Sequence, residues 1–277
     1  MKYTFLIMML FGIVNLLVAQ SEESYSITDI KAMAINDSIR NADPMILSRK
    51  YKRDPAFDYW VAGNSKRIID EDYVGAIQDY SKSIDINPLS GSGYLGRGWA
   101  KEKIKDYTGA IQDYTKAIEL NSYYLTFGNE EENLYIDRAE LKILLDDYRG
   151  AIQDCNKAIE LNPKNINAYF NRGYSKSQLG DYRGSIQDYS KVIELDPSNS
   201  EAYCDLGVSK SRLKDYQGAI QASTKAIELN PNDAIAYYNR GLDRLKIGDK
   251  NGGCLDLSKA GELGLEDAYE SIKESCN

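Results

Sequence analysis

The sequence predicts an all-α fold in which helix-turn-helix units stack as a solenoid. Three observations lead to this prediction. An Asp-Tyr dipeptide recurs, and its tyrosines are 34, 41, 34 and 34 residues apart: Tyr73, Tyr107, Tyr148, Tyr182 and Tyr216. Each dipeptide is followed by apolar residues at helical spacing, and a sixth, degenerate copy begins at Asp249. Self-similarity at this period is typical of arrays in which each unit contacts only its neighbours.

The N-terminus predicts export. Lys2 precedes an apolar run from Phe5 to Val18, Ala19 is a small residue suited to cleavage, and polar residues follow at once. Residues 1–19 are therefore expected to be a signal peptide. An uncleaved membrane anchor is the alternative, but the run is shorter than the roughly 20 residues that a spanning helix needs. We expect a mature chain that is periplasmic, secreted or at the cell surface, without membrane insertion.

The rest of the chain divides at the repeats. Residues 20–55 carry no repeat signal and are expected to form a linker with one short helix. Residues 56–265 are expected to form six units, and residues 266–277 a capping helix. In the fourth unit Asn165 can cap the first helix and Gly180 can end it. The second helix carries an apolar stripe that stops before Pro197: Ser185, Ile186, Tyr189, Val192 and Ile193.

These positions resemble the tetratricopeptide repeat, which has an aromatic, Gly, Ala, an aromatic, Ala and Pro in register. The second unit has five of the six, with Ser122 in place of Pro: Tyr94, Gly98, Ala110, Tyr114 and Ala117. Three units depart from the pattern: the first has one extra residue near Asp70, the third has Ala139 and Cys155, and the sixth has Gly253 and Leu257. The resemblance spans residues 56–265 and implies a right-handed α-solenoid closed by a C-terminal capping helix.

The resemblance also implies a place for a partner, because this family binds extended peptides in a concave groove lined by first helices. The matching positions are mostly apolar here: Trp60, Leu95, Trp99, Ile136, Glu140, Phe170, Tyr174, Cys204, Val208, Tyr238 and Leu242. The predicted partner-binding groove consists of Leu95, Trp99, Ile136, Phe170, Tyr174, Tyr238 and Leu242. Only Asn64 echoes the carboxylate clamp of some family members, so an apolar ligand is expected. The alternative is that these residues only pack against neighbouring first helices.

Composition argues against other functions. The chain has no histidine, which excludes Ser-His-Asp and Cys-His catalysis and every His-ligated metal site. Its 34 basic residues are scattered among 42 acidic ones and form no basic stripe, so nucleic acid is not an expected partner. We expect no enzyme, no cofactor and no metal.

The sequence therefore favours an exported scaffold or adaptor that binds a protein or peptide, similar to the small secreted tetratricopeptide proteins of Bacteroidetes-type bacteria. A chaperone-like holder of unfolded cell-envelope proteins is the alternative. The seven extra residues before the third unit fall around positions 123–132 and are interpreted as a longer loop, an extended helix or a contact site with Tyr123, Tyr124 and Phe127. The partner and the oligomeric state stay open.

Two kinds of side-chain pair are also predicted. Arg97, Arg138, Arg172 and Arg240 each precede an Asp by sixteen residues, whereas the fifth unit lacks both members, which suggests an ion pair within each unit. The alternative is that these arginines only extend to solvent.

Cys254 and Cys276 are placed symmetrically about the turn at Leu265, so an antiparallel helix pair would bring them together as a disulfide. Cys155 and Cys204 are expected to be buried thiols.

Overall fold

The computed structural model describes residues 55–120 and 131–276. Within these ranges the chain forms thirteen helices and no strand. The predicted all-α solenoid of helix-turn-helix units is confirmed. The chain divides into two compact parts, residues 1–131 and residues 132–277, and each is described by itself.

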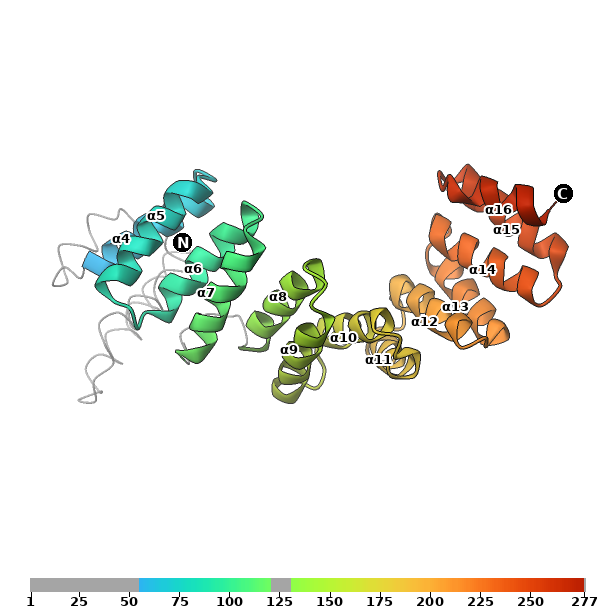
Figure 1. Ribbon diagram of the computed structural model, residues 1–277, viewed down its shortest axis with the longest axis horizontal. Helices are drawn as coiled ribbons and strands as arrows, with labels where there is room; N and C mark the ends of the chain where they lie inside the picture. The colour runs from blue at the N-terminus through green and yellow to red at the C-terminus, as the bar shows by residue number, and fades with distance from the viewer. Residues whose placement is uncertain (1–54, 121–130, 277) are drawn as a thin grey trace, which may run out of the picture. The chain divides into compact units, whose positions relative to one another are not determined.

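The N-terminal part contains two helix pairs (Figure 1). They are α4 (Pro55–Ile68) with α5 (Tyr73–Ile86), and α6 (Gly91–Lys103) with α7 (Tyr107–Glu119). Each helix packs on the next, and the two first helices, α4 and α6, also touch. Ala76, Tyr80 and Ala100 form a buried core between the pairs.

The C-terminal part, taken by itself, is also built of helix pairs and ends in a single helix. Its elements are α8 (Glu131–Leu144), α9 (Tyr148–Leu161), α10 (Ile166–Gln178), α11 (Tyr182–Leu195), α12 (Ser200–Arg212), α13 (Tyr216–Leu229), α14 (Ala234–Lys246), α15 (Lys250–Glu262) and α16 (Asp267–Ser275). The first helices α10, α12 and α14 pack on one another in sequence, and α16 packs on α15. The first helices therefore share one face.

The recurring Asp-Tyr dipeptide is a helix cap. In every unit the Asp carboxylate accepts a hydrogen bond from the backbone N–H of a glycine three residues later: Asp72, Asp106, Asp147, Asp181, Asp215 and Asp249. A Cβ on Gly109 would lie 2.2 Å from Oδ2 of Asp106, so the capped turn has no room for a side chain there. Such a cap stabilises a helix by roughly 1 kcal/mol. The repeat that first reveals the fold is therefore the signal that starts each second helix.

Two further predictions, about where α10 begins and where it ends, are confirmed. Asn165 caps α10, and Gly180, with φ +81°, ends it. The extra residue of the first unit lies in the turn between α4 and α5. There the N–H of Asp72 donates to the carbonyl of Lys66, six residues back, whereas in the second unit the N–H of Asp106 donates to the carbonyl of Lys101, five residues back.

The C-terminal helix is joined covalently to the last unit. The Sγ atoms of Cys254 and Cys276 lie 2.07 Å apart, at the distance of a disulfide, so the predicted pairing is confirmed. Cys155 and Cys204 are buried and free, also as predicted.

The predicted signal peptide, the linker up to residue 54 and the aromatic residues Tyr123, Tyr124 and Phe127 lie outside the described residues. Across residues 55–120 and 131–276, no helix combines the length and the apolar character needed to cross a membrane.

Candidate partner-binding face

The predicted binding residues come from the first helices of the units. We use the term first-helix face, within each part separately, for the surface that carries them. In the N-terminal part it holds Trp60, Leu95 and Trp99 on α4 and α6. In the C-terminal part it holds Ile136, Phe170, Tyr174, Tyr238 and Leu242 on α8, α10 and α14.

Some of these side chains are within the core. Leu95 is 7% exposed, and Ile136 is 4% exposed and packs on Ala158 and Ala168. Cys204 is 5% exposed. Phe170 is half-buried, with its ring edge-on to Tyr189 at a centroid distance of 5.5 Å. These side chains hold neighbouring helices together.

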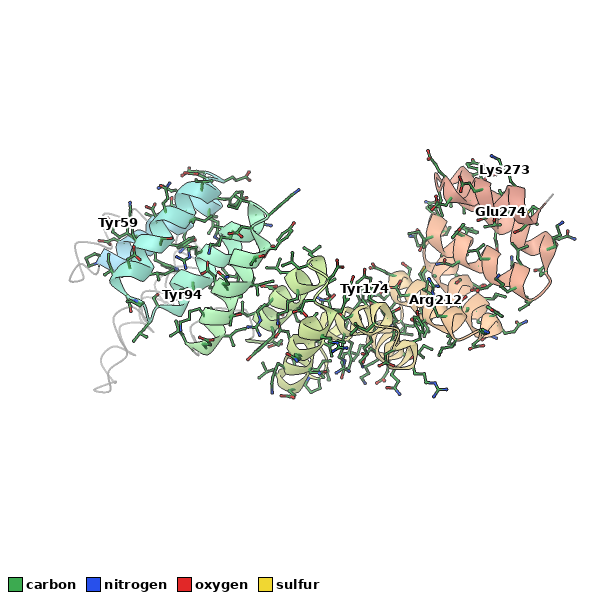
Figure 2. All side chains as sticks on the ribbon, viewed as in Figure 1. Tyr59, Tyr94, Tyr174, Arg212, Lys273 and Glu274 are labelled. Carbon is green, nitrogen blue, oxygen red and sulfur yellow. A yellow bond between two sulfur atoms is a disulfide. The ribbon has the colours of Figure 1, made fainter. Side chains whose placement is uncertain are left out.

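Besides Phe170, four of the predicted residues are only partly covered: Trp99, Tyr174, Tyr238 and Leu242. The guanidinium of Arg67 lies 5.1 Å from the centroid of the Trp99 ring. Tyr174, labelled on α10 in Figure 2, meets the ring of Tyr148 edge-on at 6.3 Å. The hydroxyl of Tyr238 lies 3.2 Å from that of Ser271 on α16. The three aromatic rings are thus held in place on one side while retaining accessible surface.

Asn64, the residue that echoes the carboxylate clamp, is used by the scaffold. It is 6% exposed. Its amide nitrogen donates to the carbonyl of Trp60 and its amide oxygen accepts from the Tyr80 hydroxyl at 3.0 Å. Both ends of the amide are therefore engaged by the scaffold.

The predicted ion pairs within the units are confirmed. In the fourth unit, Nε and Nη2 of Arg172 donate to the two carboxylate oxygens of Asp188 at 3.0 and 2.6 Å. The same two-bond geometry joins the other predicted pairs: Arg97 with Asp113, Arg138 with Asp154, and Arg240 with Asp256. The hydrogen bonds that Arg97 donates to Asp113 raise the pKa of Arg97. Each of the four Asp residues is at most 4% exposed, so the pair is a structural link rather than a surface contact.

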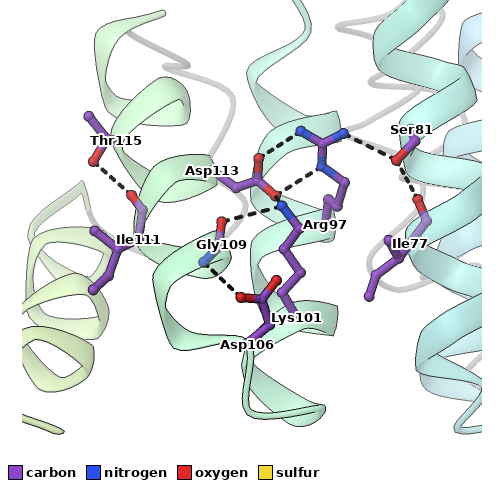
Figure 3. Close-up of polar contacts among 9 residues, drawn as sticks. All are labelled: Ile77, Ser81, Arg97, Lys101, Asp106, Gly109, Ile111, Asp113 and Thr115. Atoms are coloured by element: carbon purple, nitrogen blue, oxygen red, sulfur yellow. Dashed lines mark hydrogen bonds and ion pairs between the residues drawn. The ribbon is translucent and has the colours of Figure 1, made fainter. Parts of the chain in front are cut away.

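Sequence reasoning missed two partners of this pair, which Figure 3 shows in the second unit. Lys101, four residues after Arg97, places its Nζ 2.8 Å from Oδ2 of Asp113. Nη1 of Arg97 donates to the hydroxyl of Ser81 in the preceding unit at 3.1 Å. A basic residue recurs at the Lys101 position, which the sequence could have shown: Lys142, Lys176 and Arg244 contact their own Asp in the same way.

The fifth unit lacks this network. Leu206 and Ala222 replace the Arg and Asp, and Ser223 replaces the tyrosine that packs beneath the glycine in the first, second and fourth units. Among the described residues, the Ser223 hydroxyl is a buried group without a hydrogen-bond partner. Asp205, on the first helix α12 of this unit, accepts a hydrogen bond from the Tyr189 hydroxyl, and burial raises the pKa of this carboxyl to about 6.

The described part of the chain holds no cluster of metal ligands and no activated thiol. No group of three or more His, Cys, Asp or Glu side chains could hold a metal ion in residues 55–120 and 131–276. Burial raises the pKa of the Cys155 and Cys204 thiols to about 12 in each case, so neither is an activated nucleophile.

Comparisons with known proteins agree with this geometry. Models of the tetratricopeptide repeat match residues 92–124, 166–199 and 189–221, and a related repeat model matches residues 143–180. No curated protein sequence matches the chain.

Several solved structures share the fold. YrrB, described as a TPR protein with an unusual peptide-binding site, is 22% identical with a TM-score of 0.61, and the match covers 69% of this chain and 94% of YrrB. MamA is 24% identical with a TM-score of 0.58, covering 65% of this chain and 94% of MamA. MamA from Desulfovibrio magneticus RS-1 is 17% identical with a TM-score of 0.57, covering 62% and 94%. The chain therefore carries tetratricopeptide repeats and folds as an all-α tetratricopeptide solenoid.

Proposed function

We propose that this protein is a non-enzymatic scaffold or adaptor that acts outside the cytoplasm and binds a protein or peptide segment on its first-helix face. The binding residues would be partly exposed members of the predicted set: Trp99 in the N-terminal part, and Tyr174, Tyr238 and Leu242 in the C-terminal part. The tetratricopeptide fold supports protein binding in general, as does the peptide-binding site of YrrB, which shares this fold.

One observation carries the choice of face. The packing between units already uses its own aromatic residues, since Tyr80, Tyr114 and Tyr189 are almost completely buried beneath the glycines of the first helices. Trp99 and Tyr174 are additional to this core and keep accessible surface. Aromatic residues with accessible surface and a fixed orientation are the side chains that dominate interface energetics.

Capture of a partner by variant proteins tests the proposal. The variant Trp99→Ala/Tyr174→Ala is expected to weaken capture from the envelope fraction of the source cells by at least about 2 kcal/mol, or roughly 30-fold. Tyr269→Ala is the matched control, because Tyr269 is 52% exposed on α16 and lies outside the predicted set. Circular dichroism verifies that each variant keeps its helices.

Unchanged capture by the double variant would contradict the proposed face. Weak capture of many unrelated chains, instead of one or two at fixed stoichiometry, would favour the chaperone-like holder.

Mass spectrometry of the exported protein tests the location. The expected species begins within about two residues of Glu22, and a species that keeps Phe5 to Val18 would contradict cleavage.

A further inference from the structure

Arg67 is a half-buried cation without a carboxylate. In residues 55–120, the other cations of the first helices that lie at this depth are paired: Lys66 with Asp79, and Arg97 and Lys101 with Asp113. Arg67 forms no ion pair with any described residue. Its two contacts are a hydrogen bond from Nε to the Tyr80 hydroxyl, at 3.3 Å, and the stacking of its guanidinium over Trp99.

These two contacts fix the guanidinium in place. The Tyr80 hydroxyl that accepts from Arg67 donates in turn to the buried amide of Asn64, so the acceptor itself is immobile. The indole of Trp99 supports the guanidinium from the neighbouring helix, α6. Nη1 and Nη2 keep four N–H donors, and no acceptor for them occurs among the described residues. Such a planar fork matches the two oxygens of a carboxylate.

Three carboxylates of the adjoining helices are engaged elsewhere, and Asp70 and Glu71, in the turn after α4, form no ion pair with Arg67. Glu102, on α6, accepts a hydrogen bond from the Tyr114 hydroxyl at 2.8 Å. Asp72 caps α5 through the N–H of Gly75. Asp79 holds Lys66 and Lys82. The fork of Arg67 is thus left for a ligand from outside this part of the chain.

We propose that Arg67 and Trp99 together form a recognition site for an Asp or Glu side chain of the partner. The guanidinium takes the carboxylate, and Trp99, with Ile68 and Ile69 exposed by 50% and 64% next to Arg67, contacts the apolar residues that flank it. This inference rests on the proposed function, which it deepens by naming an acidic side chain as part of a ligand otherwise expected to be apolar.

A side-chain carboxylate fits better than a chain terminus. A terminal carboxylate is usually held by several donors at once. Asn64, three residues before Arg67 on α4, has both of its amide ends engaged by the scaffold. Arg67 therefore binds the carboxylate without help from Asn64, which suits a carboxylate carried by a flexible side chain.

Nuclear magnetic resonance of the full chain tests the site with three acetylated tripeptides: Ac-Leu-Glu-Leu-NH2, its neutral analogue Ac-Leu-Gln-Leu-NH2, and Ac-Leu-Gln-Leu-OH with a free terminus. The sequence has two tryptophans, so two indole N–H signals report on the face, and Trp60→Phe or Trp99→Phe assigns them. The Glu peptide is expected to shift the Trp99 signal with a dissociation constant about tenfold lower than that of the Gln amide.

Matched variants locate the charge. Arg67→Gln should remove the tenfold difference between the Glu and Gln amides, and Arg67→Lys should restore part of it. Lys103→Gln, which removes an exposed cation from α6, should leave the difference unchanged. A general effect of net charge would instead make Lys103→Gln resemble Arg67→Gln.

Four outcomes would overturn the inference. If the two amides bind equally well, or if their difference survives Arg67→Gln, the carboxylate site is wrong, although a shift of Trp99 by both peptides would still support the proposed function. Tightest binding of the free-terminus peptide would show that the site takes a chain terminus. No shift of Trp99 by any peptide would contradict both the site and the proposed use of Trp99.

Discussion

At the scale of single residues, the Arg–Asp pairs predict how the units tolerate substitution. Asp188 is 3% exposed and receives hydrogen bonds from Arg172 and Lys176. The change Asp188→Ala leaves these cations without a carboxylate and is expected to lower the free energy of unfolding by about 3 kcal/mol. The double change Arg172→Leu/Asp188→Ala copies Leu206 and Ala222 of the fifth unit and should cost less. Urea denaturation measures both, and a double variant less stable than the single one would contradict this account.

Asp205 predicts a pH dependence with a definite sign. Burial raises its pKa from 3.8 to about 6 in the folded chain, so the folded state holds the proton more tightly than the unfolded state. The contribution of the protonated Asp205 carboxyl to the free energy of unfolding is therefore fully present below pH 4 and is lost as the pH rises through 6. Asp205→Asn should therefore stabilise the protein more at pH 7 than at pH 4, as measured by thermal unfolding. Equal effects at the two pH values would show that this carboxyl does not titrate abnormally.

The sequence predicts a contact between two side chains best where both residues are replaced together in one of the units. The Arg–Asp pairs could be predicted because the fifth unit loses both members. The lack of a carboxylate partner for Arg67 could not be predicted, because it depends on the conformation of the turn after α4. Lys66 occupies the position that pairs with Asp, and only the structure shows that Arg67 lies over Trp99. The burial of Leu95 and Ile136 likewise depends on how closely adjacent first helices approach.

At the scale of elements, the stability of α16 depends on the disulfide between Cys254 and Cys276. It has nine residues, fewer than an isolated helix needs to be stable. The disulfide closes a loop with a sequence separation of 22 residues and is expected to contribute about 3 kcal/mol. Cys276→Ser should lower stability by this amount and speed hydrogen exchange in α16, with little effect on α10. Thiol titration of the unreduced, denatured chain should find two free thiols, and a count of four would contradict the bond.

At the scale of the whole molecule, the sequence predicted the architecture well because the repeat signals are local. Three signals act within one unit: the Asp cap, the glycine required beside that cap, and the proline or serine that ends the second helix. Each unit could therefore be interpreted without knowing the others. The binding face is different, because exposure on first helices depends on packing between units. The sequence therefore named a row of candidates, and the structure divides it into buried and accessible members.

Oxidative footprinting of the chain with and without its captured partner tests the central claim most directly. Hydroxyl radicals modify accessible aromatic side chains, so a partner on the first-helix face should protect Trp99 and Tyr174. Tyr269, exposed on α16 and outside the predicted set, provides the internal reference. The account predicts that bound partner slows oxidation of Trp99 and Tyr174 and leaves Tyr269 unchanged. Protection of Tyr269, with Trp99 and Tyr174 oxidised at their free rates, would contradict it.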